Sequence, residues 1–279
     1  MSPETTPFRT VLLDVDGTLV NTRTVLPDSA ADAVRRARAN GHRLFLCTGR
    51  SRPEIYPHLW ELGFDGLIGG NGSYIELAGE PIFVQTLDAD VVREAVEWMD
   101  SLGLGYYLEA TSGLWMNERL MPEMARLMGD DSPAGVAAAH ALMPVATDRR
   151  PERLDDVNKI SFALPVGGVD LEALARRFQG RAKIDTWSMN GLVPEFGEIG
   201  QIGIDKGAAA ARLAAHLGAD RANLIAFGDA RSDLPLFAAC GTSVAMGNAP
   251  DSVKAEATMT TSHVDEDGLA RAFAALNLI

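Results

Sequence analysis

The chain has 279 residues, of which 47% are hydrophobic and 23% charged, and its formal net charge is −13. This length allows one large or two modest domains, and the composition is that of an ordinary soluble protein. The acidic balance argues against a nucleic-acid partner, which requires a basic surface, and the apolar runs are too short to cross a bilayer.

The two cysteines, Cys47 and Cys240, lie in apolar contexts and cannot form a disulfide framework. This usage is typical of the reducing cytoplasm. The N-terminal residues MSPETTPFRT contain no apolar stretch before a cleavage site, so we expect a short loose leader and no signal peptide. We therefore predict a cytoplasmic protein without a membrane partner.

The first part of the chain alternates between strand-like and helix-like segments. Short apolar runs predict strands at Thr10–Val15, His42–Cys47 and Gly66–Gly70. Helical spacing predicts helices at Ser29–Asn40, where Gly41 is the stop, and at Pro53–Leu62. This alternation with short links predicts a doubly wound, Rossmann-like α/β core with a parallel sheet.

The middle of the chain lacks this rhythm. We predict strands at Pro81–Leu87 and Asn158–Leu164, and one or two strands over Tyr106–Met116. We also predict helices at Ala89–Leu102 and Val169–Gln179, and a hairpin over Ala182–Phe196 that turns at Asn190–Gly191. The stretch Gly129–Arg153 has only weak patterning. Strands and helices without the parallel rhythm predict a separate α+β module.

The first rhythm then returns, with helices predicted at Lys206–Leu217 and Ser232–Ala239 and strands at Asn223–Phe227 and Thr242–Met246. We therefore predict an α/β core formed by residues 1–80 and 192–279. Residues 81–191 would form an inserted cap domain.

Two carboxylates close the first predicted strand, in the run DVDGT that begins at Asp14. Residues two apart in a strand point to the same side, so Asp14 and Asp16 can converge at its carboxyl end, where open α/β sheets bind ligands. Such close carboxylates repel each other unless a cation compensates, and Mg²⁺ accepts oxygen ligands of this kind. The alternative is an acidic turn that caps a helix; the flanking apolar residues and Gly-Thr favour the metal site.

Polar residues follow two further predicted elements. In Thr48-Gly49-Arg50, a hydroxyl and backbone N–H groups suit a phosphate, although an ordinary turn with a solvated Arg50 is the alternative. Lys206 opens a helix, where it opposes the helix dipole unless an anion lies nearby. Its alternative is a surface lysine paired with Asp205.

The run GDARSD, which begins at Gly228, follows another predicted strand. Asp229 is expected at the strand end and Asp233 one turn into the next helix, while Ser232 or Asp229 as a simple helix cap is the alternative. Acids, a hydroxyl and a lysine at four such points of one fold together predict a phosphate and metal site.

These motifs, in this order, resemble those of the haloacid dehalogenase superfamily, in particular the Cof-like phosphatases with a large α/β cap (type IIB). The matches are DVDGT from Asp14, Thr48 in CTGR, Lys206 in GIDKG and GDARSD from Gly228, with softer matches at Asn71-Gly72, at MGNAP from Met246 and at Glu266. The resemblance spans nearly the whole core, whereas the cap matches mainly by size and position.

The resemblance implies a phosphatase in which Asp14 is the nucleophile and forms an acyl phosphate. It implies that Asp16 protonates the leaving oxygen and then activates water. Thr48 and Lys206 would hold the transferring phosphoryl group. Gly49, Arg50 and Asn71 would also contribute to phosphate or substrate binding.

The resemblance further implies Mg²⁺ bound by Asp14, the backbone carbonyl of Asp16, and Asp229, with Asp233 in support. One residue departs from the pattern, because Ser232 stands where the fourth motif often has Asn; this bears on rate more than on reaction type. The implied partner is a small phosphorylated metabolite, such as a sugar phosphate.

Two rival functions stay open, namely a phosphomutase of the same fold and a binding protein that has lost catalysis. Asn158, Lys159, Trp187 and Met189 are plausible pocket residues of the cap, with core packing the favoured role for Trp187.

Overall fold

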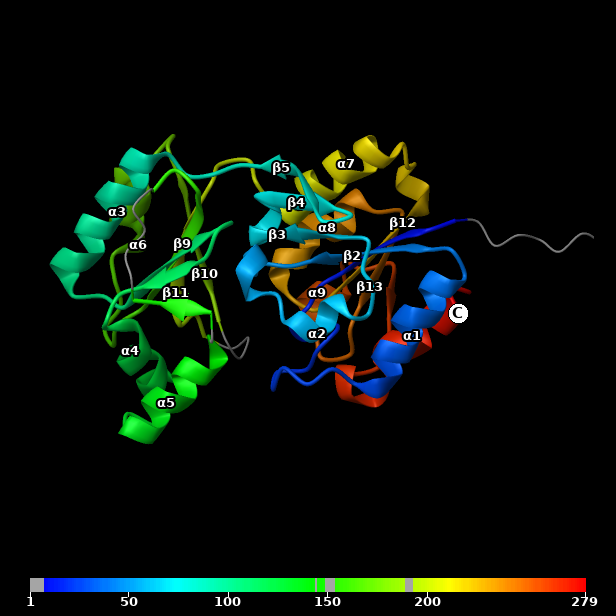
Figure 1. Ribbon diagram of the computed structural model, residues 1–279, viewed down its shortest axis with the longest axis horizontal. Coiled ribbons are helices and arrows are strands. Elements are labelled where there is room, and N and C mark those ends of the chain that lie inside the picture. The colour runs from blue at the N-terminus through cyan, green and yellow to red at the C-terminus, as the bar shows by residue number, and fades with distance from the viewer. Residues whose placement is uncertain (1–7, 144, 149–153, 189–192) are drawn as a thin grey trace, which may run out of the picture. The chain divides into compact units, whose positions relative to one another are not determined.

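Figure 1 shows a computed structural model that describes residues 8–143, 145–148, 154–188 and 193–279. The chain divides into two compact units. Unit 1 comprises the described residues of Met1–Arg50 together with Tyr56–Val84 and Ile204–Ile279. Unit 2 comprises the described residues of Ser51–Ile55 and Gln85–Gly203.

Unit 1 contains an eight-stranded sheet in the order β14-β13-β12-β1-β2-β3-β4-β5. Strands β14 to β3 are parallel, and β4 and β5 extend the sheet in antiparallel fashion. The central strands are short apolar runs buried on both faces, which is what a parallel sheet between helices requires. The strands are β1 (Thr10–Leu13), β2 (Arg43–Cys47), β3 (Gly66–Gly69), β4 (Tyr74–Leu77), β5 (Glu80–Val84), β12 (Leu224–Gly228), β13 (Thr242–Ala245) and β14 (Met259–Thr260).

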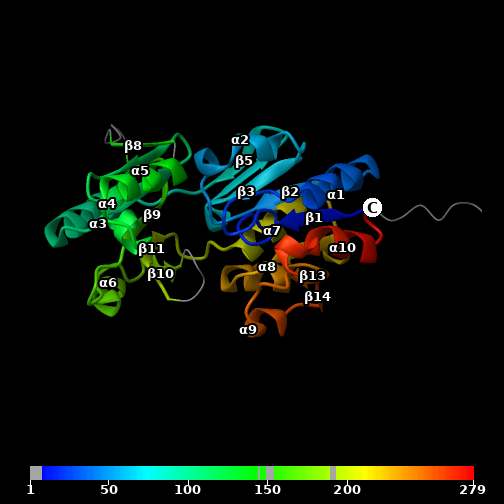
Figure 2. The same ribbon diagram turned by 90° about the horizontal axis from the view of Figure 1, so that it is seen from below.

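Helices cover both faces of this sheet (Figure 2). On one face, α7 and α8 share a core with Leu12, Phe45 and Ala226. The next residue, Phe227, contacts Phe273 of α10 on the opposite face, and α10 packs against α1. The helices of unit 1 are α1 (Asp28–Ala39), α2 (Pro57–Trp60), α7 (Lys206–Leu217), α8 (Leu234–Ala239), α9 (Asp251–Lys254) and α10 (Gly268–Ala275).

Two segments differ from the sequence-based expectation. The helix expected over Pro53–Leu62 is reduced to a 3-10 turn at Arg52–Glu54 and the single turn of α2. Pro57 lacks an N–H and holds Tyr56 in an extended conformation, so one helix cannot pass through both. The strand predicted at Pro81–Leu87 corresponds to β5, but it pairs with β4 in unit 1. This hairpin was not predicted, because its turn uses positive φ angles at Ala78 and Gly79 in place of a typical Asn-Gly signal.

Unit 2 contains a six-stranded sheet in the order β10-β11-β9-β6-β7-β8. Helices α3 and α6 share one core with this sheet, and α4 and α5 share another. Its strands are β6 (Tyr106–Ala110), β7 (Leu114–Met116), β8 (Ala146–Thr147), β9 (Val157–Ala163), β10 (Lys183–Trp187) and β11 (Phe196–Gly200), and its helices are α3 (Ala89–Leu102), α4 (Leu120–Leu127), α5 (Pro133–Leu142) and α6 (Leu171–Arg177).

The limits of the units differ from those expected. The segment of unit 1 that begins at Tyr56 extends to Val84 because β5 pairs with β4. Unit 2 extends to Gly203 because β11 pairs with β10 and β9. The predicted boundaries after residues 80 and 191 therefore lie earlier in the chain than the limits at Val84 and Gly203. The predicted turn at Asn190–Gly191 lies outside the described residues.

Helix α5 occupies part of the stretch that has weak patterning in the sequence. Ser132 caps it by accepting a hydrogen bond from the N–H of Gly135, and its alanine-rich interior gives no apolar stripe that a periodicity search could detect. Among the described residues, no helix is both long enough and apolar enough to cross a membrane.

Candidate active site

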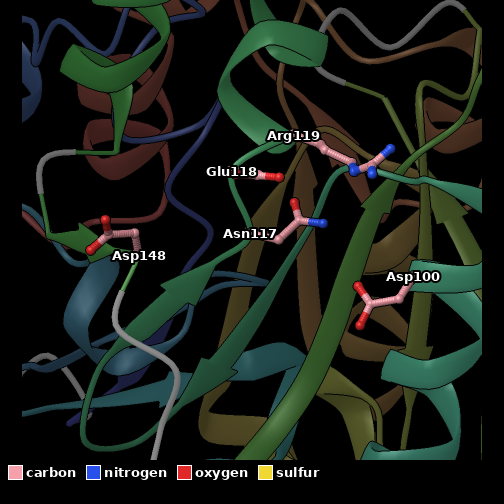
Figure 3. A pocket seen from close by; sticks show the side chains of 5 residues that line it. All are labelled: Asp100, Asn117, Glu118, Arg119 and Asp148. Carbon is pink, nitrogen blue, oxygen red and sulfur yellow. The ribbon is translucent and has the colours of Figure 1, made fainter.

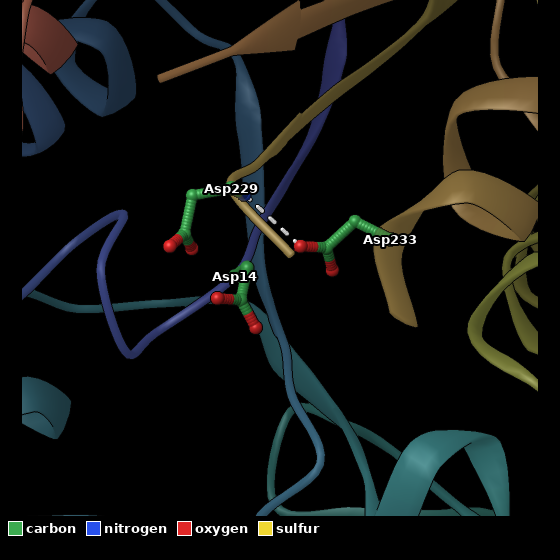
Figure 4. Close-up of side chains that lie close together, drawn as sticks. All are labelled: Asp14, Asp229 and Asp233. Atoms are coloured by element: carbon green, nitrogen blue, oxygen red, sulfur yellow. Dashed lines mark hydrogen bonds between the residues drawn. The ribbon is translucent and has the colours of Figure 1, made fainter. Parts of the chain in front are cut away.

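Asp14 and Asp229 lie side by side because they follow two paired strands. β1 and β12 are parallel neighbours with Leu13 opposite Phe227, and the N–H of Asp14 donates to the carbonyl of Phe227 at 3.0 Å. A third carboxylate, that of Asp233, comes from the turn after β12. One oxygen of each of these three aspartates lies within 4.8 Å of the others (Figure 4).

Lys206 joins this cluster from the first turn of α7. Its Nζ donates to Oδ1 of Asp14 at 2.7 Å and to Oδ1 of Asp233 at 2.6 Å, and only 2% of its side chain is exposed. Burial alone would lower the pKa of Lys206, but the carboxylates of Asp14 and Asp233 raise it well above its usual value. Lys206 is therefore a buried ammonium, rather than a surface lysine paired with Asp205.

Asp233 organises the loop after β12. Its Oδ2 accepts hydrogen bonds from the N–H groups of Asp229 and Ala230, each at 3.0 Å, while its Oδ1 accepts from Lys206. A Cβ on Gly228 would lie 2.4 Å from Cγ of Asp233, so only glycine lets the carboxylate lie this close to the strand end. Asp233 thus fixes both the loop and the lysine.

Asp229 is oriented by Thr18 and Asn248, which are not among the predicted site residues. Thr18 Oγ1 donates to Oδ1 of Asp229 at 3.1 Å, and Asn248 Nδ2 donates to Oδ2 at 3.2 Å and to the carbonyl of Gly17 at 2.8 Å. Gly17 has φ +84°, and a Cβ there would lie 2.3 Å from Oδ2 of Asp229. The signals were present, since Thr18 belongs to DVDGT and Asn248 to MGNAP.

The donor set fits a hard divalent cation. Burial raises the pKa of Asp14 well above its usual value, although Lys206 acts against this, and burial together with Asp233 raises the pKa of Asp229 to about 7. Three carboxylates therefore face one ammonium, and the charge left over disfavours ionisation until a cation is added. Carboxylate oxygens are the ligands that Mg²⁺ prefers, so the aspartate cluster is a candidate metal site.

Asp16 lies apart from this cluster. Its side chain is 47% exposed, and both oxygens accept hydrogen bonds from Arg50, at 2.6 Å from Nε and 2.8 Å from Nη2. The sequence predicts Arg50 as a phosphate or substrate ligand, whereas the structure places its guanidinium on Asp16. The metal contribution predicted for Asp16 is that of its backbone carbonyl, not of this side chain.

The loop after β2 brings Thr48, Gly49 and Asn71 together. The buried Thr48 accepts the N–H of Arg50 on Oγ1 at 3.1 Å and the N–H of Asn71 on its carbonyl at 3.1 Å. A Cβ on Gly49 would lie 3.0 Å from Oδ1 of Asn71. Strands β1 and β2 are parallel neighbours with Leu13 opposite Leu46, so the end of β2 borders the end of β1 that carries Asp14. Burial raises the pKa of the Cys47 thiol at this strand end well above its usual value.

The predicted pocket residues of unit 2 are engaged in its own structure. Asn158 donates to the carbonyl of Gln85 at 3.1 Å, and Lys159 pairs with Glu198 at 2.9 Å and with Glu109 at 3.3 Å. Trp187 stacks on Phe196 with ring centroids 4.3 Å apart, which agrees with core packing. Met189 lies outside the described residues.

Unit 2 also contains a polar pocket, shown in Figure 3, that holds none of the predicted site residues. Its polar groups serve the fold: Asn117 bonds the backbone of Leu104 and Tyr106, and Asp100 accepts from the Tyr106 hydroxyl. The pocket is therefore not a second candidate for the chemistry. Its lining residues are Asp100, Asn117, Glu118, Arg119 and Asp148.

The haloacid dehalogenase-like hydrolase family matches residues 11–273. The pyridoxal phosphate phosphatase YbhA of Escherichia coli (strain K12) is 26% identical over 278 residues, covering 94% of this chain and 96% of that protein. The 5-amino-6-(5-phospho-D-ribitylamino)uracil phosphatase YcsE of Bacillus subtilis (strain 168) is 24% identical, with 96% of each chain covered.

Solved structures share the architecture. The crystal structure of a haloacid dehalogenase-like hydrolase from Bacteroides thetaiotaomicron matches with a TM-score of 0.83 and 25% identity, covering 97% of this chain and 100% of that chain. The subclass IIB sugar phosphatase BT4131 matches with a TM-score of 0.76 and 22% identity, covering 97% and 100%. The predicted fold class, an α/β core with an inserted α+β domain, is confirmed.

Proposed function

The chain belongs to the haloacid dehalogenase-like hydrolases, as its motifs predict, and we propose that it is a Mg²⁺-dependent phosphatase that forms an aspartyl-phosphate on Asp14. Membership makes it a hydrolase of phosphomonoesters that acts on small phosphorylated metabolites. Beyond this reaction class, we propose which residues carry out the reaction, what each does, and that Mg²⁺ is the metal.

The observation that carries the proposal is the buried Lys206 ammonium bonded to Asp14 beside Asp229 and Asp233. A carboxylate so placed can approach a phosphate dianion because the cation offsets their mutual repulsion. In the first step an oxygen of Asp14 bonds to phosphorus while the bond from phosphorus to the leaving oxygen breaks. Asp16 gives its proton to that oxygen.

In the second step water attacks phosphorus of the aspartyl-phosphate, and Asp16, now ionised, takes the proton of that water. The bond between phosphorus and the Asp14 oxygen breaks, which releases inorganic phosphate and restores Asp14. We propose that Thr48 and Gly49, from the loop after β2, and Asn71, from the turn after β3, bind the phosphoryl oxygens. The positive charge of Lys206 would complement the negative charge of those oxygens.

Asp14, Asp229 and the backbone carbonyl of Asp16 would hold Mg²⁺, with Asp233 in a supporting role. When bound, the ion would offset the negative charge of the carboxylates and of the transferring phosphoryl group. Asp233 supports the site through the loop, because both of its oxygens already accept hydrogen bonds from Lys206 and from the backbone.

We propose that unit 2 selects the substrate, which fits the separation of every chemical motif into unit 1. The relatives YbhA and YcsE, with 26% and 24% identity, are named for phosphomonoesters with different leaving groups, so neither substrate transfers to this chain. A sugar phosphate or similar metabolite is our proposed class. A cytoplasmic location is part of the proposal, supported by the buried free thiols of Cys47 and Cys240.

The test is phosphate release by the purified protein over a panel of phosphorylated metabolites, with and without Mg²⁺. A phosphatase releases phosphate and loses activity on chelation, with recovery when Mg²⁺ is returned. A phosphomutase of the same fold would isomerise its substrate and release little, and a binding protein would release none. Full activity after exhaustive chelation would refute the metal assigned to Asp14 and Asp229.

A further inference from the structure

We propose that Arg50, held by Tyr56, is the residue that positions the carboxyl group of Asp16 for proton transfer to the leaving oxygen. The proposal rests on the proposed function, since it takes Asp16 as the acid of the first step. It gives Arg50 a role other than the phosphate contact that its motif predicts. All three residues belong to unit 1.

The contact between Arg50 and Asp16 is a two-point clamp. Nε donates to Oδ2 at 2.6 Å and Nη2 donates to Oδ1 at 2.8 Å, so the guanidinium and carboxylate planes meet along two parallel hydrogen bonds. A single bond would let the carboxylate turn about the Cβ–Cγ axis, whereas two bonds fix that torsion. Each oxygen keeps a second lone pair, which leaves room for the proton that the reaction uses.

Arg50 is itself fixed from several directions. Its Nη2 donates to the Tyr56 hydroxyl at 2.7 Å, and its guanidinium carbon lies 4.5 Å from the centroid of the Tyr56 ring. His58 stacks on that ring at 5.6 Å with an interplanar angle of 16°. The backbone of Arg50 is held by Thr48 Oγ1 and by the N–H of Gly70. Arg50 is therefore a preorganised group and not a solvated side chain.

Asp16 needs such a group more than the other acids of the site do. Asp14 and Asp233 are almost fully buried and are held by Lys206, whereas the Asp16 side chain is 47% exposed. An exposed carboxyl group that nothing orients loses efficiency as a proton donor, because the donor must lie within hydrogen-bond reach of the leaving oxygen. The requirement is greatest for a poor leaving group such as an alkoxide.

The experiment compares leaving-group release in the first turnover for two substrates, 4-nitrophenyl phosphate and glycerol phosphate. The first turnover isolates the step in which Asp16 is the acid, and nitrophenolate departs without much help from a proton. Arg50→Met removes the clamp while keeping much of the side-chain length. We expect it to slow glycerol phosphate at least tenfold more than 4-nitrophenyl phosphate, with little change in KM.

Two further variants and one control sharpen this result. Tyr56→Phe removes only the hydroxyl and should show the same selective loss to a smaller extent, and Arg50→Lys, with one donor point, should lie between Arg50→Met and the wild type. Arg52→Met makes the same replacement at a nearby exposed arginine and should leave both rates unchanged.

Equal losses on both substrates, together with a raised KM and weaker inhibition by inorganic phosphate, would show that Arg50 binds the phosphate and would overturn the proposal. Failure of the proposed function looks different, because the wild type would then release neither leaving group. If Asp16→Asn slowed glycerol phosphate no more than 4-nitrophenyl phosphate, Asp16 would not be the acid of the first step. The positioning role proposed for Arg50 would then be refuted as well.

Discussion

At the scale of single residues, the aspartate cluster has more carboxylates than cations. Lys206 bonds two of the three clustered aspartates, and Thr18 and Asn248 supply neutral donors to the third. A neutral donor orients Asp229 without cancelling its charge, which leaves that charge for the divalent cation that we propose for this site.

Asp14→Asn should abolish turnover and leave the fold intact. The amide is nearly isosteric with the carboxylate but cannot attack phosphorus, and removing one buried charge relieves the repulsion from Asp229 and Asp233. We expect less than about 1% of the wild-type rate, a barrier increase above ~2.7 kcal/mol, with an unchanged circular dichroism spectrum. A variant that kept more activity than this would exclude covalent catalysis at Asp14.

Asn248→Ala should raise the Mg²⁺ concentration needed for half-maximal activity by about 10- to 100-fold, because Asp229 loses a donor that orients it. A Mg²⁺ activation titration measures this. Asn223→Ala is a matched control, since Asn223 bonds Arg9 at the opposite end of β12 and should leave the titration unchanged. Equal shifts in the two variants would assign the effect to general destabilisation.

His42 should make stability depend on pH. Burial, with the nearby Arg9 charge, lowers the pKa of His42, and Nδ1 already accepts the N–H of Arg9 at 3.2 Å. The unfolded chain therefore binds a proton on His42 more readily than the folded protein does. The free energy of unfolding is at its full value above the unfolded pKa of about 6.5, where His42 is neutral in both states, and it decreases as pH falls below that value. Urea unfolding at several pH values should show this slope, and His42→Phe should flatten it.

At the scale of elements, the sequence predicts well where a local signal decides the structure. Central strands such as β1 and β12 are buried apolar runs. Helix α7 is bounded in the sequence by a capping residue, Asp205, and by Gly218. Thr18 and Asn248 were not assigned to the site because their role depends on the contact of three distant segments. The Arg50–Asp16 clamp has the same origin, since no spacing rule joins residues that lie on different strand ends.

The start of α7 carries a prediction of its own. Asp205 caps the helix by accepting the N–H of Ala208 at 2.7 Å, directly before Lys206. Asp205→Ala should destabilise this turn by about 1 kcal/mol, whereas Asp205→Asn keeps an acceptor and should cost less. Hydrogen exchange of the amides of Lys206–Leu217, read by mass spectrometry, reports the difference. If amide protection in Asp205→Ala were the same as in the wild type, the cap would contribute nothing to the stability of this turn.

At the scale of the whole molecule, the sequence indicates two units but not their limits. The predicted boundary at residue 191 lies before β11, whose partners β9 and β10 decide to which unit it belongs. Lys159 illustrates the same difficulty. The sequence suggests a pocket residue, whereas the structure buries its ammonium between Glu109 and Glu198.

Lys159→Met should destabilise unit 2 by about 3–5 kcal/mol, because it removes the buried ammonium that pairs with the largely buried carboxylates of Glu109 and Glu198. Lys183→Met, which breaks an exposed pair with Asp185, should cost under about 1 kcal/mol. Three of the four tryptophans lie in unit 2, so urea unfolding followed by tryptophan fluorescence reports mainly on that unit. Equal midpoints for the two variants would contradict the structural role of Lys159.

The place of β1 between β2 and β12 has a consequence for biosynthesis. The ribosome releases β1 near the start of translation, but its partner β12 follows only after all of unit 2. At roughly 5–20 residues per second, β1 waits on the order of ten seconds or more with one edge unpaired, while unit 2 is already complete and free to fold. The nascent chain therefore brings Asp14 and Asp229 together only after unit 2 has been made, and a slow or destabilised β12 would expose an apolar edge to chaperones.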